Sequence, residues 1–240
     1  MSLLKLRSAL RKHQNKKKAA LLQGFFKTGP GEYAEGDIFL GVNVPTLRNL
    51  ASRYRDLSLS DTLNLLRSPI HEERLLSLLI LMLKYRKAGS PYKKIIYEAY
   101  LKNTKYINNW DLVDVSAKRI IGDFLNDRSR APLYKLALSS DLWERRISIL
   151  STFHFIGNND FADAIKIAGI LILDKHDLIH KAVGWMLREI GKRDVNTEER
   201  FLKKHCGTMP RTMLRYAIER FPEPKRQAYL KDVRKKTEAR

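Results

Sequence analysis

The feature that most constrains the fold is a recurring apolar pattern with a charged residue at a fixed place in it. In the segment 108–124 this place is occupied by Asp114. Four other segments carry a cation there: Arg74, Arg146, Lys181 and Arg215. Successive members are separated by 40, 32, 35 and 34 residues, a spacing typical of helical-repeat arrays. We therefore expect an all-α fold, a solenoid of two-helix repeats in which equivalent positions stack along one face.

The register of these repeats is defined by shared spacing more than by identity, so it can slip by one residue. Trp110, Trp143 and Ile179 precede the aligned charges by four, three and two residues. In such a solenoid the starts of the second helices line one edge of the concave surface, where a row of cations can follow a phosphate backbone. The alternative is that these are solvated charges at helix ends. Recurrence over five segments favours the functional interpretation.

Length and composition fit a single repeat domain over residues 1–240, with a basic C-terminal tail from about residue 222 to 240. Hydrophobic residues make up 44% of the chain, which is enough for a core and argues against disorder. The 46 Lys and Arg residues against 26 Asp and Glu give a formal charge of +20. This excess favours a polyanionic partner, but ribosomal or membrane-surface binding would produce the same charge.

Several classes of site have no support in the sequence. Cys206 is the only cysteine, which excludes an intramolecular disulfide and a cysteine-rich metal site. The six histidines lack a metal-ligand spacing, and the pair His176 and His180 has no third ligand nearby. We expect neither a metal nor a cofactor.

No apolar run reaches the ~20 residues that a membrane-spanning helix requires. The longest such runs are 75–83 and 167–173. Before Glu32 the chain has no acid, as in some transit peptides, but Leu3, Leu6 and Leu10 follow an ordinary helical rhythm. We therefore expect the first helix of the fold here, and a cytoplasmic protein.

Local signals place several helix boundaries. Ser68-Pro69 is expected to open a buried inner helix through residues 75–83, with Glu72 and Glu73 near its positive end. Asp141 to Glu144 has the form of a capping box for the helix that holds Arg146. Asp177 is expected to open the helix that holds Lys181.

Three motifs and their order resemble the AlkD family of DNA alkylation-repair glycosylases. These are Trp110-Asp111-Leu112-Val113-Asp114, Leu142-Trp143-Glu144-Arg145-Arg146 and the segment 181–189 around Trp185, with Phe39–Pro45 as a further match near the start. The resemblance extends from about the first helix to beyond Trp185. It implies a right-handed α-α superhelix of HEAT-like repeats, a curved solenoid whose basic concave face cradles duplex DNA.

The resemblance also assigns roles to individual residues. It implies that Asp114 is the catalytic carboxylate, that Trp110 and Trp185 flank the deoxyribose of the lesion, and that Arg146 holds the backbone nearby. Lys181, Arg74 and Arg215 are expected to contact phosphates as members of the basic row. Asn43 stands where the best-known member has glutamine, and Phe25 where it has tyrosine, so the hydroxyl at that place is missing. Tyr33, in the loop 29–37, is a further candidate for DNA contact.

The implied chemistry is the removal of positively charged N3- and N7-alkylated purines from double-stranded DNA. Breaking the purine–sugar bond develops an oxocarbenium-like cation on deoxyribose. A carboxylate about 4 Å away, at an effective dielectric near 20, offers on the order of 4 kcal/mol of attraction. If this attraction acts mainly in the transition state, it increases the rate roughly a thousandfold. The alkylated base is already a cation and leaves neutral, so a second acid is unnecessary.

Each site residue also has a structural interpretation. Trp110 and Trp185 can be repeat core, and Trp143 is assigned to packing. Asp114 can be an ordinary acid paired with Arg146 or Lys118, at ~0–1 kcal/mol. Asp111 lies on nearly the same helix face and is expected to orient neighbours or cap the helix.

Two functions from different classes follow. The first is a monomeric, monofunctional DNA glycosylase in the cytoplasm, associated with the nucleoid through its DNA. The alternative is a non-catalytic HEAT-repeat protein that binds nucleic acid or serves as a scaffold. Basic runs such as Lys16–Lys18, Lys203-Lys204 and Arg234–Lys236 predict salt-sensitive binding in either case.

Overall fold

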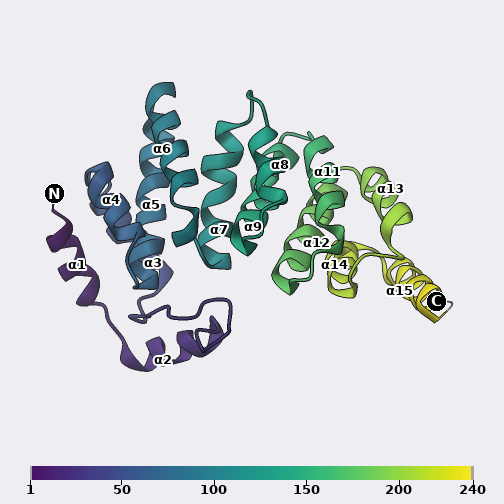
Figure 1. Ribbon diagram of the computed structural model, residues 1–240, viewed down its shortest axis with the longest axis horizontal. Coiled ribbons are helices and arrows are strands. Elements are labelled where there is room, and N and C mark those ends of the chain that lie inside the picture. Colours follow the sequence, from purple (N-terminus) through teal and green to yellow (C-terminus); the bar gives the residue numbers. More distant parts are fainter. Residues whose placement is uncertain (1, 239–240) are drawn as a thin grey trace. The chain divides into compact units, whose positions relative to one another are not determined.

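The structure, a computed structural model, describes the backbone of residues 2–238 and the side chains of residues 2–231. Within this range every regular element is helical, apart from an isolated parallel β-bridge between Ile38 and Ile70. The all-α expectation is confirmed (Figure 1).

The chain divides into two compact units, Met1–Ile120 and Ile121–Arg240, called unit 1 and unit 2 below. The sequence predicts one cooperative domain, and joint unfolding of the two units stays a prediction. Unit 1 contains α1 (Leu3–Arg11), α2 (Lys16–Phe25), α3 (Val44–Arg53), α4 (Leu59–Leu66), α5 (His71–Lys87), α6 (Ser90–Lys102), a 3-10 turn (Thr104–Tyr106) and α7 (Trp110–Ala117).

Helix α5 is the core of unit 1. It packs against α3, α4, α6 and α7, and it is buried from its first residue to Met82, as its all-round apolar sequence predicts. It begins at His71, so the prediction that Ser68 caps it is wrong. The Ser68 hydroxyl instead accepts the Ile70 amide at 3.1 Å, and the His71 amide donates to the Ile38 carbonyl at 2.8 Å. These bonds hold Ile70 in an extended conformation just before the helix.

Helix α2 and the loop after it lie beneath the lower ends of α3 and α5 in Figure 1. The chain returns close to α2 at Gly41, whose φ is +79°. A Cβ at this position would lie 2.2 Å from the Asn15 carbonyl oxygen, so only glycine allows the approach. The Asn15 amide donates to the Leu40 carbonyl at 2.9 Å and completes the junction.

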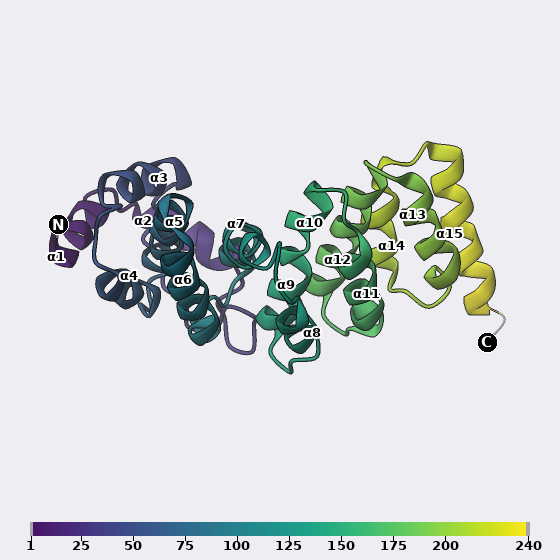
Figure 2. The same ribbon diagram turned by 90° about the horizontal axis from the view of Figure 1, so that it is seen from above.

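Unit 2 begins at Ile121, within a π-helical segment, Lys118–Gly122. It contains α8 (Ala131–Ala137), α9 (Leu142–Ser151), α10 (Phe153–Gly157), α11 (Ala162–Ile170), α12 (Asp177–Gly191), α13 (Val195–His205), α14 (Arg211–Ala217) and α15 (Glu223–Glu238), with 3-10 turns at Leu171–Leu173 and Ile218–Arg220. Helix α12 is its centre and packs against α9, α11, α13 and α14 (Figure 2).

The repeat register is confirmed to within the slip of one residue. Asp114, Arg146, Lys181 and Arg215 are each the fifth residue of their helix, and Arg74 is the fourth residue of α5. The five charges aligned by the apolar pattern therefore occupy the same position along their helices, to within one residue.

The predicted starts of two unit 2 helices are also confirmed. Asp141 is the N-cap of α9 and accepts the Trp143 and Glu144 amides at 2.7 and 3.0 Å. Glu144 accepts the Ser139 hydroxyl, which in turn accepts the Asp141 amide. Helix α12 begins at Asp177 with His176 as its N-cap.

No helix in the described part of the chain is both long enough and apolar enough to cross a bilayer. The basic run Arg234–Lys236 falls within α15, but its side chains lie outside the described residues.

Candidate functional site

Four consecutive polar residues open α5, and all four are buried: His71, Glu72, Glu73 and Arg74. Burying four ionisable side chains in one helical turn is costly unless each finds a partner. All four bind segments outside α5. The first turn of α5 therefore organises unit 1 around the start of α7.

Glu72 binds the backbone that follows Ile38. Its carboxylate accepts the amides of Leu40, Gly41 and Val42 at 2.9, 2.7 and 3.2 Å. Glu73 pairs with Arg7 of α1 at 3.0 Å. The two glutamates thereby attach the loop and α1 to the same turn of α5.

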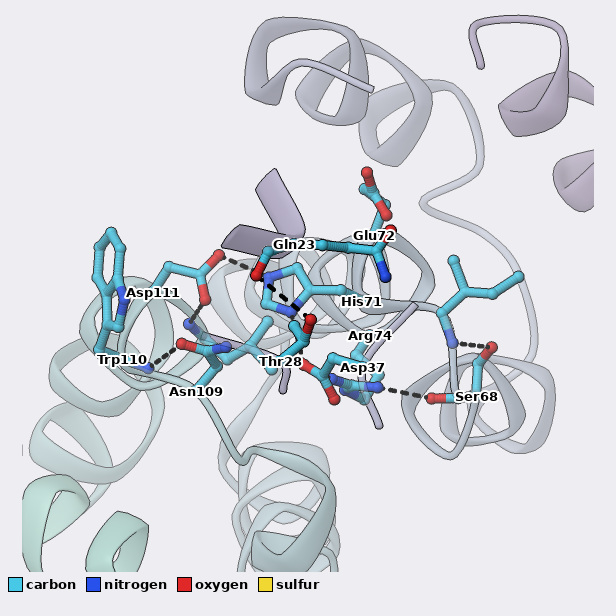
Figure 3. Close-up of polar contacts among 12 residues, drawn as sticks. Gln23, Thr28, Asp37, Ser68, His71, Glu72, Arg74, Asn109, Trp110 and Asp111 are labelled. Carbon is cyan, nitrogen blue, oxygen red and sulfur yellow. Dashed lines mark hydrogen bonds and ion pairs between the residues drawn. The ribbon is translucent and has the colours of Figure 1, made fainter. Parts of the chain in front are cut away.

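His71 and Arg74 form a buried network with two aspartates (Figure 3). Asp37 lies 3.2 Å from His71 Nδ1 and 2.5 Å from an Arg74 guanidinium nitrogen. His71 Nε2 lies 2.8 Å from Asp111 Oδ2, on the first turn of α7. Arg74 also donates to the Ser68 carbonyl at 2.9 Å. The network joins residues 34 to 40 positions apart in the sequence.

The charges of this network support one another. Burial alone would disfavour the charged form of His71, but the Asp111 carboxylate and the hydrogen bonds to Asp111 and Asp37 outweigh it and raise the pKa of the imidazole. Burial likewise opposes ionisation of Asp37, yet His71 and Arg74 hold the pKa of its carboxyl below the ordinary value. Mutual pairing therefore favours the charged forms of Asp37 and His71 inside unit 1.

An aromatic stack lies beside this network. The ring of Phe26 is parallel to that of Trp110, with centroids 5.2 Å apart, and it also stacks on Phe39 at 5.0 Å. Phe39 in turn stacks on the imidazole of His71 at 4.5 Å. Phe25, 64% exposed, meets Trp110 edge to face. Trp110 is only partly buried and packs against the cluster that contains Phe26 and Phe39.

The two acids of α7 differ in their surroundings. Asp111 uses one carboxylate oxygen for His71 and the other for the Leu112 amide at 2.9 Å, so it orients a neighbour as expected. Asp114 is also partly buried. Burial raises the pKa of the Tyr100 hydroxyl, and the nearby charge of Asp114 adds to this effect. Asp114 follows Trp110 by one helical turn on α7, so the two side chains share a helix face.

Unit 2 contains Trp185, the other tryptophan that the resemblance assigns to the site. Trp185 on α12 is partly buried, meets Phe153 edge to face, and donates from Nε1 to Glu189 at 3.1 Å. Trp143 is 6% exposed and belongs to the core, which confirms its assignment to packing. The burial pattern thus separates the packing tryptophan from the two that the resemblance assigns to the site.

The four cations of the predicted basic row differ in exposure and in bonding partners. Arg74 is 3% exposed and bound to Asp37, and Arg146 is 5% exposed and donates to the Leu178 carbonyl. Contact of either with a phosphate would require these buried side chains to become more exposed. Lys181 is partly exposed and pairs with Asp177, whereas Arg215 is exposed. The expectation that all four cations form one accessible row does not fit the burial of Arg74 and Arg146.

The remaining candidates lie in or beside the loop of unit 1. Asn43 is exposed and is the N-cap of α3, where its side-chain oxygen accepts the Thr46 amide at 2.9 Å. Tyr33 is partly buried in the loop between α2 and Asp37. Neither residue belongs to the polar network around His71.

Sequence reasoning missed His71, Asp37, Phe26 and Phe39. The one local signal was the run of four polar residues at the start of an otherwise apolar helix. Among the side chains that the structure describes, no group of three or more His, Cys, Asp or Glu residues has the geometry to hold a metal ion.

Comparison with known proteins gives a consistent result. Residues 6–221 match the family model described as DNA alkylation repair enzyme. A predicted DNA alkylation repair enzyme from Enterococcus faecalis superposes with a TM-score of 0.67 at 13% identity, covering 88% of this chain and 98% of that one. AlkD2 from Streptococcus mutans superposes with a TM-score of 0.54 at 17% identity, covering 87% and 99%. A search of curated protein sequences found no match.

Proposed function

Because this chain belongs to the family of DNA alkylation repair enzymes, we propose that it is a monofunctional DNA glycosylase for cationic N3- and N7-alkylated purines in duplex DNA. The observation that carries the proposal is the arrangement on α7. Asp114 and Trp110 share one helix face, while the competing acid, Asp111, is bound to His71 and to the Leu112 amide. We assign the positioning of α7 to Asp111, and the chemistry to Asp114 as the resemblance implies.

Asp114 is proposed to stabilise the sugar cation that develops as the base departs, and to orient the attacking water. A carboxylate about 4 Å from the sugar contributes on the order of 4 kcal/mol at an effective dielectric near 20. The ring of Trp110, a partly buried residue, is proposed to add a cation–π attraction of ~0.5–2 kcal/mol. Both interactions grow as the C–N bond breaks, so they lower the barrier instead of tightening ground-state binding.

The substrate class follows from having one acid assigned to the reaction. An N3- or N7-alkylated purine carries a positive charge and leaves as a neutral base, so its departure needs no proton. A neutral purine would need a general acid as well, and Asp111 is charge-paired with His71. We therefore restrict the proposal to cationic lesions.

For unit 2 by itself we propose DNA contact through Trp185, Lys181 and Arg215. These side chains are exposed or partly exposed, in contrast to Arg146. Cations at such positions neutralise phosphates, and the affinity is expected to fall steeply with salt concentration. Arg146 is proposed to act within unit 2, where it holds the first turn of α12 through the Leu178 carbonyl.

The test is the release of 7-methylguanine from methylated duplex DNA under single-turnover conditions. We expect Asp114→Asn to lower the rate by about a thousandfold, which is the loss of on the order of 4 kcal/mol of transition-state attraction. Asp56→Asn, at an exposed carboxylate paired with its neighbour Arg55, is the matched control and should keep the wild-type rate. DNA binding by Asp114→Asn should be equal or tighter.

Absence of base release from well-folded wild-type protein that still binds DNA would reject the glycosylase and favour a non-catalytic binding protein. Release should be insensitive to metal chelators, and the protein is proposed to be a monomer that needs no cofactor. Equal rates for Asp114→Asn and Asp56→Asn would show that another group performs the reaction.

A further inference from the structure

Both ring nitrogens of His71 face a carboxylate. Nδ1 lies 3.2 Å from Asp37 Oδ2, and Nε2 lies 2.8 Å from Asp111 Oδ2 (Figure 3). An ionised carboxylate only accepts hydrogen bonds, and a neutral imidazole has a single N–H. With neutral His71, one aspartate would therefore face a lone pair. The geometry matches a doubly protonated ring that donates to both sides.

The surroundings of the ring favour this cation. From α7 it meets Asp111, from the loop Asp37, and from its own helix Arg74, the one cation that opposes it. Phe26 and Phe39 contribute aromatic faces without charge, with centroids 5.1 and 4.5 Å from the imidazole. Aromatic faces attract cations, and two carboxylates outnumber one guanidinium. The net effect is the raised pKa of His71 described above.

This cation holds the first turn of α7. Asp111 is the second residue of that helix and lies between Trp110 and Leu112 in the chain. Its carboxylate is bound on one side by His71 and on the other by the Leu112 amide, so it cannot turn without breaking one of these bonds. The ring of Trp110 is meanwhile stacked on Phe26, which also contacts His71. Two routes thus lead from the imidazole to Trp110.

We propose that His71 is a positioning residue: as a cation clamped between Asp37 and Asp111, it fixes the first turn of α7 and with it the placement of Trp110 and Asp114. Its importance for base release rests on the proposed function. The fixing of Trp110 does not, and it can be measured without substrate.

Two substitutions separate positioning from mere packing. The amide nitrogen of glutamine takes the place of Nε2, so His71→Gln keeps a donor toward Asp111 at every pH. The amide nitrogen of asparagine takes the place of Nδ1, so His71→Asn donates to Asp37 and releases Asp111. We expect His71→Asn to lose on the order of 10- to 100-fold in base release, as displaced groups do, and His71→Gln to lose less than about threefold.

The pH profile gives a second readout. The wild-type rate should fall on the alkaline side as His71 loses its proton, and this limb should be absent in His71→Gln. Asp111→Asn removes the carboxylate charge that favours the imidazolium, so its alkaline limb should move to lower pH. A residue that only filled space would change none of these limbs.

The substrate-free measurement uses 5-fluorotryptophan and ¹⁹F NMR. The chain has three tryptophans, so each resonance can be assigned by a single Trp→Phe substitution. The Trp110 resonance should move with pH in the wild type, stay constant in His71→Gln, and broaden or shift in His71→Asn. Arg7→Gln breaks the neighbouring ion pair to Glu73 without touching α7, and it should lower stability while leaving this resonance in place.

The outcomes are distinguishable. Equal losses in His71→Gln and His71→Asn, with an unmoved Trp110 resonance in both, would overturn the positioning role. A Trp110 resonance that follows His71 as expected, in a protein that releases no base, would support the positioning of α7 and reject the glycosylase. If a variant fails to fold, the wild-type pH titration of the Trp110 resonance still decides the matter, because a resonance that does not titrate contradicts the proposal.

Discussion

Unit 1 and unit 2 each bury a glutamate almost completely, and the two have opposite surroundings. Glu72 in unit 1 is 2% exposed, and its carboxylate accepts three backbone amides. Glu198 in unit 2 is 1% exposed, and its Oε1 has no hydrogen-bond partner within the described part of the chain. Burial reinforced by Glu199 raises the pKa of Glu198 to about 8. Depth of burial therefore does not predict how an acid affects the free energy of unfolding. Its hydrogen-bond partners decide whether it stabilises or destabilises the fold.

A third buried acid, Glu189, has hydrogen-bond partners, but they are close to it in the sequence. It is 7% exposed and binds Trp185, four residues earlier, and Lys192, three residues later, all on or next to α12. Glu72 joins segments about 30 residues apart, whereas Glu189 joins neighbours that one helix already holds together. The bonds of Glu72 in unit 1 are thus long-range, whereas the bond of Glu189 to the candidate tryptophan of unit 2 is local.

The largest expected effect is that of Glu72→Gln. The glutamine amide presents donors to backbone amides that are themselves donors, so at least one buried N–H is left without an acceptor. We expect the free energy of unfolding to fall by about 3–4 kcal/mol, since hydrogen bonds to a charged group contribute ~1.5–3 kcal/mol each. Urea denaturation followed by circular dichroism measures this. A loss below about 1 kcal/mol would show that the loop 38–42 is held by other contacts.

The next largest effect is that of Glu198→Gln, which is expected to raise the free energy of unfolding. Glutamate in the unfolded chain loses its proton near its ordinary pKa of 4.5, while folded Glu198 keeps it to about pH 8. The folded state therefore binds more protons between these values, and the free energy of unfolding falls as pH rises through this window. Glu198→Gln should remove this dependence and stabilise the protein by about 2–3 kcal/mol at pH 7.

The measurement for Glu198→Gln is thermal or urea unfolding at pH 5, 6, 7 and 8, with the wild type beside it. At pH 5 the two proteins should differ little, and the gap should widen with pH. A parallel pH dependence in both proteins would mean that Glu198 is not the group responsible.

The smallest effect is that of Glu189→Gln. The amide oxygen still accepts from Trp185 Nε1, and the lost charge affects mainly Lys192 and Arg193, whose side chains are 41% and 32% exposed. Pairs of this kind are worth ~0–1 kcal/mol. We expect a loss of stability below about 1 kcal/mol and a base-release rate within about threefold of the wild type. A loss of stability as large as that of Glu72→Gln would contradict the contrast between the long-range bonds of Glu72 and the local bonds of Glu189.

Much of the fold was predictable because helical periodicity is a local property. The five aligned charges fall at the fourth or fifth residue of their helices, and the apolar segment 75–83 is indeed the inner helix of unit 1. The start of α5 was misplaced because Ser68-Pro69 has the composition of a helix cap. A backbone bridge from Ile38, over thirty residues earlier, shifts the helix start to His71.

The candidate site was only partly predictable because its charges are paired over long distances. Asp37 lies 37 residues before Arg74, so no local pattern indicated that this arginine would be buried instead of facing phosphate. His71 was dismissed among histidines without metal-ligand spacing, yet its partners are 34 and 40 residues away. The choice of Asp114 over Asp111 came from the resemblance, and the bond between His71 and Asp111 adds a physical reason for it.

The enclosed imidazolium of His71 has one more consequence. Its two N–H protons are shielded by Phe26, Phe39 and two carboxylates, so they should exchange with water only when unit 1 opens locally. Such slowly exchanging ring protons give separate low-field signals in a proton spectrum. Unit 1 would thus carry a built-in marker of its own integrity, readable without labels, dyes or DNA.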